Sequence, residues 1–162
     1  MNHLLTTPRI DEMRAALRHM VRELGFMQKG LAGTELSPSA VHTIIELGYG
    51  KVTNASDLAA LLHLEKSSVS RLVQKLESDG LIKVRLDLSN KRSRFLSLTQ
   101  DGQDLLGEIE GFARRQLRSA LDALSANDVA QIETGVILFA KCLSAEGERV
   151  TYAVPEVKVQ EG

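Results

Sequence analysis

The segment from residue 58 to residue 80 constrains the fold more than any other part of the chain. Its sequence, LAALLHLEKSSVSRLVQKLESDG, has one helical apolar pattern over residues 58–62 and a second over residues 66–78. A tight turn at His63 and Leu64 separates the two patterns, and Gly80 ends the second. Two short helices can cross closely where a small residue lies at their contact, and Ala59 is placed for that role. The segment therefore predicts a helix-turn-helix.

A predicted hairpin follows the second helix directly. Residues 81–85 and 94–98 alternate between apolar and polar side chains, as half-buried strands do, and a polar stretch, 87–93, lies between them. Upstream, Ser37 and Pro38 predict the start of another helix that runs to about residue 47. Asn54 is placed to begin the first short helix of the pair. Residues 37–98 are thus expected to form a winged helix-turn-helix lobe with its own core.

The second helix of the pair is expected to present a polar face suited to DNA. Short hydroxyl side chains allow close approach to a groove, and Arg71 and Gln74 can form bidentate hydrogen bonds with base edges. The alternative is an ordinary solvated helix surface. The hairpin that follows favours DNA binding. The predicted face consists of Lys66, Ser67, Ser68, Ser70, Arg71, Gln74 and Lys75.

Charge is distributed unevenly along the chain. Residues 66–94 contain eight basic and three acidic residues, although the whole chain has a net charge of −1. A basic segment within an otherwise acidic chain is the electrostatic pattern of a protein that binds a polyanion. Three of these cations, Lys91, Arg92 and Arg94, lie within four residues at the hairpin tip. They suit a wing that crosses the phosphates and enters the neighbouring minor groove.

Both ends of the chain carry apolar stripes with no evident partner in the lobe. Apolar residues recur every three or four positions over residues 8–31, where Thr7 is a candidate cap, over 99–124, where Thr99 or Asp101 is the candidate cap, and in a last helix that Ser125 begins. Burial against a second copy of the chain would cover these stripes, so we expect a homodimer. An intramolecular helical bundle is the alternative. The stripes consist of Ile10, Met13, Leu17, Met20, Leu24, Met27 and Leu31; Leu105, Leu106, Ile109, Phe112, Leu117, Leu121 and Leu124; and Val129, Ile132, Val136, Phe139 and Leu143.

These observations predict a mainly α fold with a small β-wing. Residues 1–36 and 99–146 are assigned to the helical dimerisation region. Residues 37–98 are assigned to the winged helix-turn-helix DNA-binding lobe, and residues 147–162 to a C-terminal tail.

The sequence LEKSSVSRLVQKLESDGLIKV resembles the recognition helix and first wing strand of the MarR/SlyA family of bacterial transcriptional regulators. NKRSRFLSLTQDG resembles the wing, the second strand and the start of the long helix that follows in that family. The resemblance implies a triangular homodimer on a pseudo-palindromic site, and repression relieved by a small ligand or an oxidant. It also implies that Ser67, Ser68, Ser70, Arg71 and Gln74 contact the groove and that Arg92 is the wing-tip arginine.

Three residues depart from the family pattern. Asn90 stands where a wing aspartate is usual, and His63 stands where the turn often has glycine. Histidine tolerates the positive φ that such a turn needs. Glu65 replaces the usual small capping residue before the recognition helix.

The candidate effector site is a pocket between the dimer helices and the lobe, the location that the family implies. His19, Arg22 and His42 are candidates to bind a small anionic or aromatic effector there, and ordinary surface or helix-junction roles are the alternative. The single cysteine, Cys142, is expected to be a buried structural residue, because the family's peroxide sensors carry their thiol in the first helix. The four histidines are scattered, so no metal or other cofactor is expected.

The sequence favours a regulator over an enzyme. It has no Gly-rich phosphate loop after a strand, no nucleophile elbow and no HExxH. It also has no long apolar span and no signal peptide, so we expect a cytoplasmic protein. The expected function is sequence-specific binding of double-stranded DNA by a homodimeric repressor. The alternative is a winged-helix module for protein docking or DNA architecture.

Overall fold

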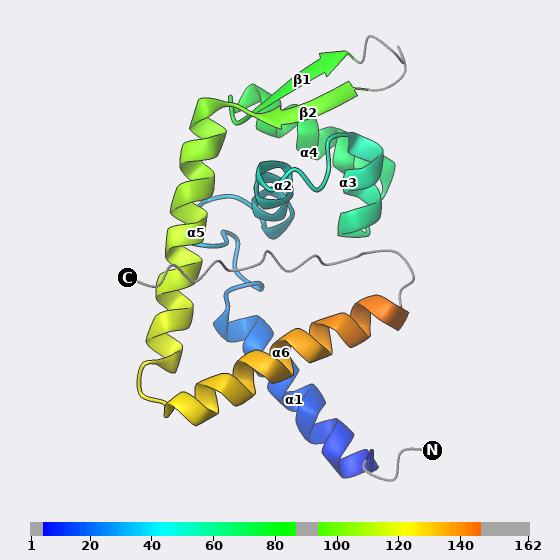
Figure 1. Ribbon diagram of the computed structural model, residues 1–162. Coiled ribbons are helices and arrows are strands. Elements are labelled where there is room, and N and C mark those ends of the chain that lie inside the picture. The colour runs from blue at the N-terminus through cyan, green and yellow to red at the C-terminus, as the bar shows by residue number, and fades with distance from the viewer. Residues whose placement is uncertain (1–4, 87–93, 147–162) are drawn as a thin grey trace. The chain divides into compact units, whose positions relative to one another are not determined.

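The computed structural model describes residues 5–86 and 94–146. It has the expected order of elements (Figure 1). They are α1 (Thr7–Glu23), α2 (Pro38–Gly48), α3 (Ala55–Leu62), α4 (Lys66–Ser78), β1 (Ile82–Leu86), β2 (Arg94–Leu98), α5 (Gln100–Leu121) and α6 (Ala126–Glu146). The fold is mainly helical with a small two-stranded wing, as predicted. The chain divides into two compact units, and the boundary lies after Gln116, within α5.

Short polar residues begin four of the helices. Ser37 Oγ accepts from Ala40 N at the start of α2, and Asn54 Oδ1 accepts from Ser56 N and Asp57 N at the start of α3. Thr99 Oγ1 accepts from Gly102 N, and Ser125 Oγ accepts from Asp128 N. These bonds satisfy backbone donors that have no partner inside the helix. They confirm the starts that were predicted at Ser37, Asn54 and Ser125. Of the two caps predicted for the long helix, Thr99 and Asp101, Thr99 makes the capping bond.

Helix α1 is shorter than predicted. It ends at Glu23 rather than near residue 31, because Leu24 caps it and Gly25 follows with φ +84°. A left-handed residue cannot continue a right-handed helix. Thr6, and not Thr7, occupies the N-cap, and its side chain makes no capping hydrogen bond. The apolar spacing alone misplaced the end because it continues through the irregular segment 24–36.

The helix-turn-helix forms as the sequence predicts. His63 adopts the left-handed conformation with φ +51°, and Leu64 N donates to Ala59 O at 3.0 Å. Ala59 is buried, with 8% of its surface exposed, as expected of the small residue where α3 meets α4. Glu65 occupies the N-cap of α4 without a side-chain capping bond. Helix α4 ends at Ser78, and Gly80 follows with φ +74°.

The wing is an antiparallel pair in which Ile82 lies opposite Leu98 and Leu86 lies opposite Arg94. A further hydrogen bond, from Leu96 N to Thr53 O at 2.7 Å, connects β2 to the segment before α3. The wing is therefore held to the helix-turn-helix by backbone as well as by side chains. The polar tip predicted at 87–93 lies outside the described residues.

The hydrophobic core of the first unit extends beyond residues 37–98. Its most buried side chains include Ile44, Leu58 and Leu76, at the centre of the helical lobe. Leu31 and Ile109 belong to the same core, and each is less than 7% exposed. We expected residues 37–98 to bury a core by themselves. The core also needs side chains from the segment between α1 and α2 and from α5. The division of the chain into dimerisation and DNA-binding regions stays a prediction.

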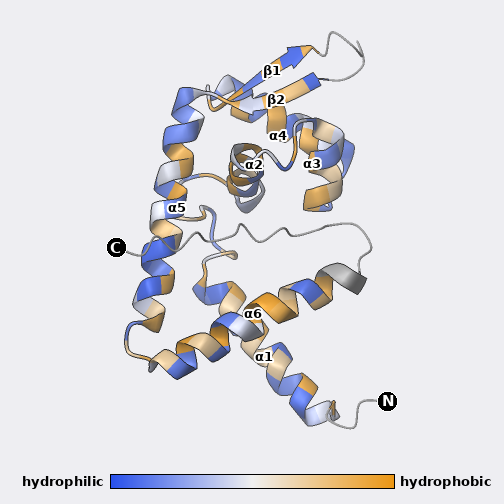
Figure 2. Cartoon of the chain, viewed as in Figure 1, coloured by the Kyte–Doolittle hydropathy of each residue, from blue (hydrophilic) through white to orange (hydrophobic). Residues whose placement is uncertain are grey.

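Apolar residues remain exposed on α1 and α6, each considered within its own unit. No residue of α1 is buried, and the described residues of α6 are also exposed or half-buried. The hydropathy colouring shows apolar residues along both helices (Figure 2). Cys142 on α6 is exposed, so the expectation of a buried cysteine is wrong for the single chain. Within the described residues, no helix is long and apolar enough to cross a membrane.

Candidate nucleic-acid interface

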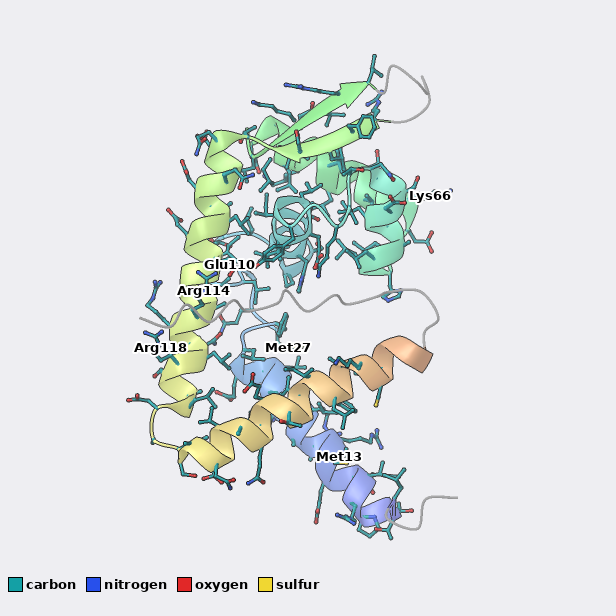
Figure 3. The ribbon with its side chains drawn as sticks, in the orientation of Figure 1. Met13, Met27, Lys66, Glu110, Arg114 and Arg118 are labelled. Carbon is teal, nitrogen blue, oxygen red and sulfur yellow. The ribbon has the colours of Figure 1, made fainter. Side chains whose placement is uncertain are left out.

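Helix α4 has one buried face and one polar face. Val69, Val73 and Leu76 are buried in the core. The residues predicted to contact DNA lie on the remaining surface, where all are exposed except Ser68, which is half-buried. Lys66, at the first turn of α4, extends away from the lobe (Figure 3). The structure therefore leaves the predicted polar face accessible: Lys66, Ser67, Ser68, Ser70, Arg71, Gln74 and Lys75.

A pocket with a volume of about 270 Å³ lies between α4, the start of α3 and the wing. Lys66, Ser70 and Gln74 line it from α4, and Arg94 lines it from β2. The structure thus brings together four predicted residues from two elements. Two polar residues that sequence reasoning missed also line it, namely Ser56 and Glu77, with Val73, Val84, Leu96 and Ala55 as apolar neighbours. Nothing in the local pattern around Ser56 marked it, because its position depends on how α3 crosses α4.

The cations of α4 differ in their surroundings. Lys75 Nζ pairs with Asp79 at 3.0 Å, one turn along the same helix. Lys66 and Arg71 have no ion-pair partner within the part of the chain that the structure describes. The carboxylate of Asp79 partly neutralises Lys75, so the positive potential of the helix surface comes mainly from Lys66 and Arg71.

The wing adds exposed cations. Arg94 opens β2 opposite Leu86 and is exposed, whereas Lys91 and Arg92 lie outside the described residues. Lys83 and Arg85 are also exposed on β1, where the alternation of the strand directs them away from Ile82 and Val84. These two cations were absent from the predicted site, although the strand pattern itself indicated their exposure.

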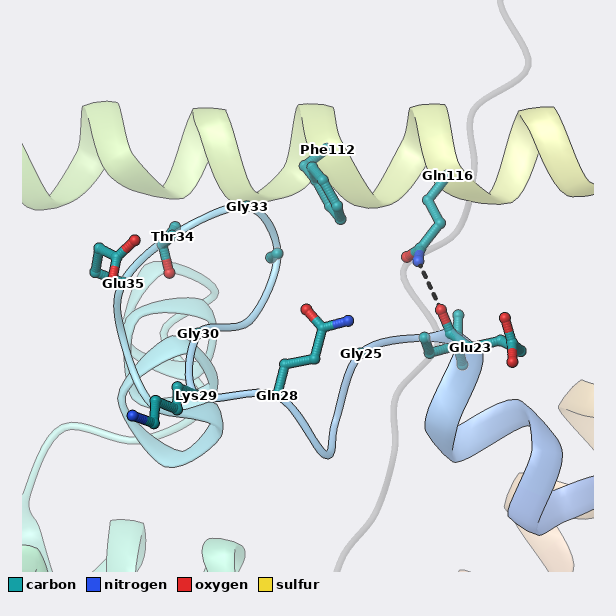
Figure 4. A pocket seen from close by; sticks show the side chains of 12 residues that line it. Glu23, Gly25, Gln28, Lys29, Gly30, Gly33, Thr34, Glu35, Phe112 and Gln116 are labelled. Carbon is teal, nitrogen blue, oxygen red and sulfur yellow. Dashed lines mark hydrogen bonds between the residues drawn. The ribbon is translucent and has the colours of Figure 1, made fainter.

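A second pocket lies within the first unit, where the segment after α1 faces α5 (Figure 4). Its volume is about 550 Å³. Phe112 and Gln116 of α5 form one wall, and Gln116 Nε2 donates to Glu23 O at 3.2 Å. The opposite wall is the segment that contains Gln28, Lys29, Gly33, Thr34 and Glu35.

The candidate effector residues do not line this pocket. His19 lies 3.7 Å from Glu23 across one turn of α1, and His42 of α2 stacks on Phe26 with ring centroids 6.0 Å apart. Arg22 is exposed near the end of α1. The structure does not bring the three into one cavity, and their role in ligand binding stays a prediction. Within residues 5–86 and 94–146, no group of His, Cys, Asp and Glu side chains is arranged to hold a metal ion.

Comparisons with known proteins agree with this geometry. The family model named "MarR family" matches residues 36–93. The HTH-type transcriptional regulator PetP of Rhodobacter capsulatus is 34% identical over 73 residues, which are 45% of this chain. The chain matches 44% of the length of PetP.

Solved structures resemble the fold over more of the chain. Streptococcus pneumoniae FabT in complex with DNA has a TM-score of 0.70 at 21% identity and covers 86% of this chain and 99% of its own. A mutant of S. aureus MepR bound to an oligodeoxyribonucleotide has a TM-score of 0.54 at 19% identity, over 86% of this chain and 99% of its own. Identities this low support the fold alone.

Proposed function

We propose that this chain is a sequence-specific regulator of transcription of the MarR type that binds double-stranded DNA as a repressor. The MarR family model that matches residues 36–93 supports this proposal. The exposed polar face of α4 beside the cationic start of β2 is the observation that carries the proposal. PetP is named as a transcriptional regulator, and the FabT and MepR structures contain DNA, which supports the same reading.

Helix α4 is the recognition helix in this proposal. Its first turns enter the major groove, where Arg71 and Gln74 form bidentate hydrogen bonds with base edges. Lys66 lies at the helix start, close to the phosphates, and the serines allow the helix to approach the bases. Lys91, Arg92 and Arg94 of the wing contact phosphates and the adjacent minor groove. The phosphate contacts set affinity and register, and the base contacts set specificity.

The protein acts as a homodimer on a pseudo-palindromic operator in this account. The exposed apolar residues of α1 and α6 support dimerisation, because water-exposed apolar patches of this kind are usually covered by another protein surface. Residues 1–36 and 99–146 supply this interface. On α1 the exposed set includes Ile10, Met13, Met20 and Val21, and on the second unit it includes Leu117, Leu124, Ile132, Val136, Leu138 and Leu143.

A small anionic or aromatic effector relieves repression in the same proposal. The 550 Å³ pocket supports it, because that volume suits a small molecule and the lining combines Phe112 with polar groups such as Lys29 and Gln28. His19, Arg22 and His42 are retained as candidates to bind an effector outside this pocket.

Selection from random duplex DNA tests the proposal. The full chain is mixed with a pool of random duplexes at physiological salt, and the bound fraction is amplified and sequenced over several rounds. Enrichment of an inverted repeat with half-sites about one helical turn apart supports a dimeric sequence-specific regulator. A pool that gains no shared sequence contradicts it.

A further inference from the structure

The end of α2 contacts α5 at two points one turn apart. A Cβ at Gly48 would lie 2.3 Å from Leu106 Cδ2, so the absence of a side chain at Gly48 permits the close approach of the two helices. The next residue, Tyr49, donates a hydrogen bond from its hydroxyl to Glu110 Oε1. Leu106 and Glu110 are four residues apart and therefore lie on the same face of α5. The two contacts lie one turn apart along α5 and hold it close to the end of α2.

The second contact is a three-residue cluster, which we call the α2–α5 clasp: Tyr49, Glu110 and Arg114. Glu110 uses both oxygens, because Oε2 accepts from Arg114 Nη2 at 2.7 Å. Both side chains belong to the middle of α5 (Figure 3). Glu110 is half-buried, with 22% of its side chain exposed, so its carboxylate is less hydrated than that of a fully exposed residue and both of its oxygens have protein partners.

The two helices that the clasp joins, α2 and α5, occupy different places in the fold. Helix α2 is part of the lobe core, where Ile44 is fully buried, and the chain after it reaches Thr53, which hydrogen-bonds to wing strand β2. Helix α5 starts at the wing and continues past the clasp to Leu121. The helix rises about 1.5 Å per residue, so the stretch from Gln100 to Glu110 makes a lever of about 15 Å. A rotation of about 10° at the clasp would therefore displace the wing end of α5 by about 3 Å.

We propose that Tyr49 is a positioning residue that sets the separation of the two DNA half-sites, by fixing the direction in which α5 leaves the lobe. This inference rests on the proposed function, since only a dimer that binds an inverted repeat has half-sites to separate. Tyr49 touches no base in this account; it acts through Glu110.

The alternative is a surface hydrogen bond with a small effect on stability and none on DNA geometry. The dependence of affinity on the distance between the two half-sites distinguishes the two possibilities. A variant that is only less stable should lose affinity by the same factor for duplexes of every spacer length. A variant in which the contact between α2 and α5 is weakened should instead lose its preference for one spacer length.

The test uses duplexes that contain the selected half-site twice, with the central spacer lengthened or shortened by one or two base pairs. The full-length parent is compared with Tyr49→Phe, which retains the ring, and with Glu110→Gln. The matched control is Asp104→Asn, because Asp104 is an acidic residue of α5 whose hydrogen bond, from Gln100, stays within that helix. Urea unfolding of each variant confirms that it is folded.

We expect the parent and Asp104→Asn to prefer one spacer. Tyr49→Phe and Glu110→Gln should lose about two- to fivefold of that preference, while their affinity for a duplex with a single half-site stays unchanged. Equal preference in all four proteins would overturn the role of the clasp, and so would a uniform loss at every spacer. If the parent selects no inverted repeat, the proposed function itself fails and the inference fails with it.

Discussion

Gly33 lies so close to Phe112 that a Cβ at Gly33 would stand 2.9 Å from the ring carbon Cδ2. Gly33 also has φ +75°, a backbone conformation that favours glycine. The contact brings the segment after α1 against α5 and closes one side of the 550 Å³ pocket (Figure 4). The pocket therefore depends on a residue with no side chain.

Gly33→Ala should lower the free energy of unfolding by about 1–3 kcal/mol, because the new methyl group meets the ring of Phe112 and the backbone is strained. Urea denaturation measures the change. Gly107→Ala is the control, since Gly107 lies in α5 and the added Cβ would meet no described atom within 4 Å other than the adjoining backbone of its own helix. Alanine in an exposed helix should stabilise it by up to about 1 kcal/mol. Equal effects of the two substitutions would contradict the role assigned to the Phe112 contact.

Arg71→Ala should weaken binding to the selected operator by about 1–3 kcal/mol and relax specificity at one position of each half-site. Arg71 is exposed on α4 and has no ion-pair partner among the described residues, so its guanidinium is available for a base. Fluorescence anisotropy with single-base variants of the operator measures both effects. A uniform loss across all sequences would instead assign Arg71 to a phosphate.

Arg92→Ala and Arg94→Ala should weaken binding to all duplexes to a similar degree. Each lost phosphate contact releases one counterion fewer, so the slope of log K against log salt should become shallower by about 0.9. Titrations at two or more salt concentrations give the slope. Lys75→Ala is the comparison, because Lys75 already pairs with Asp79 and should change the slope less. An unchanged slope in both wing variants would remove the wing from the interface.

Met13→Asp and Val136→Asp should each shift the protein from dimer to monomer. Met13 is 49% and Val136 is 52% exposed in the single chain, and a charge buried in an apolar interface is costly. Sedimentation equilibrium reports the mass directly. Gln131→Asp is the control, because it places the same charge at an exposed polar position of α6. If the parent is already a monomer at micromolar concentration, the dimer proposal is wrong.

The hydrogen bond from Tyr49 to Glu110, with burial and the charge of Glu110 adding to it, raises the pKa of the Tyr49 phenol above its ordinary value. The folded state thus favours the protonated phenol, and the stability that it gains is complete below about pH 10 and declines as the pH rises through the folded-state pKa. The difference in unfolding free energy between parent and Tyr49→Phe should therefore be constant from about pH 7 to 9 and shrink above about pH 10. A difference that already disappears near neutral pH would show that the phenol is not the donor.

Local signals in the sequence were sufficient for most of the fold. The caps at Ser37, Asn54, Thr99 and Ser125 depend on residues within three positions of each helix start, so they are visible without tertiary structure. The end of α1 was mispredicted because apolar spacing continues beyond Gly25, where the backbone turns left-handed.

Tertiary features were harder to predict. The core includes Leu31 and Ile109, which lie outside residues 37–98, because the lobe needs side chains from both flanking segments. Neither the pocket beside Phe112 nor the clasp at Tyr49 has a local signature, since each joins residues more than sixty positions apart. The polar face of α4 was predictable because a helix of known period directs its residues independently of its neighbours.

Sequence-specific DNA binding is tested most directly by anisotropy titrations of the selected inverted repeat and of a scrambled duplex with the same length and composition, at physiological salt. A sequence-specific regulator should bind the selected site at least about 10³-fold more tightly than the scrambled one. Equal, weak and salt-sensitive binding of both duplexes would contradict sequence-specific regulation and leave an architectural role. The absence of binding to either duplex would contradict DNA recognition by α4 and favour a protein-docking module.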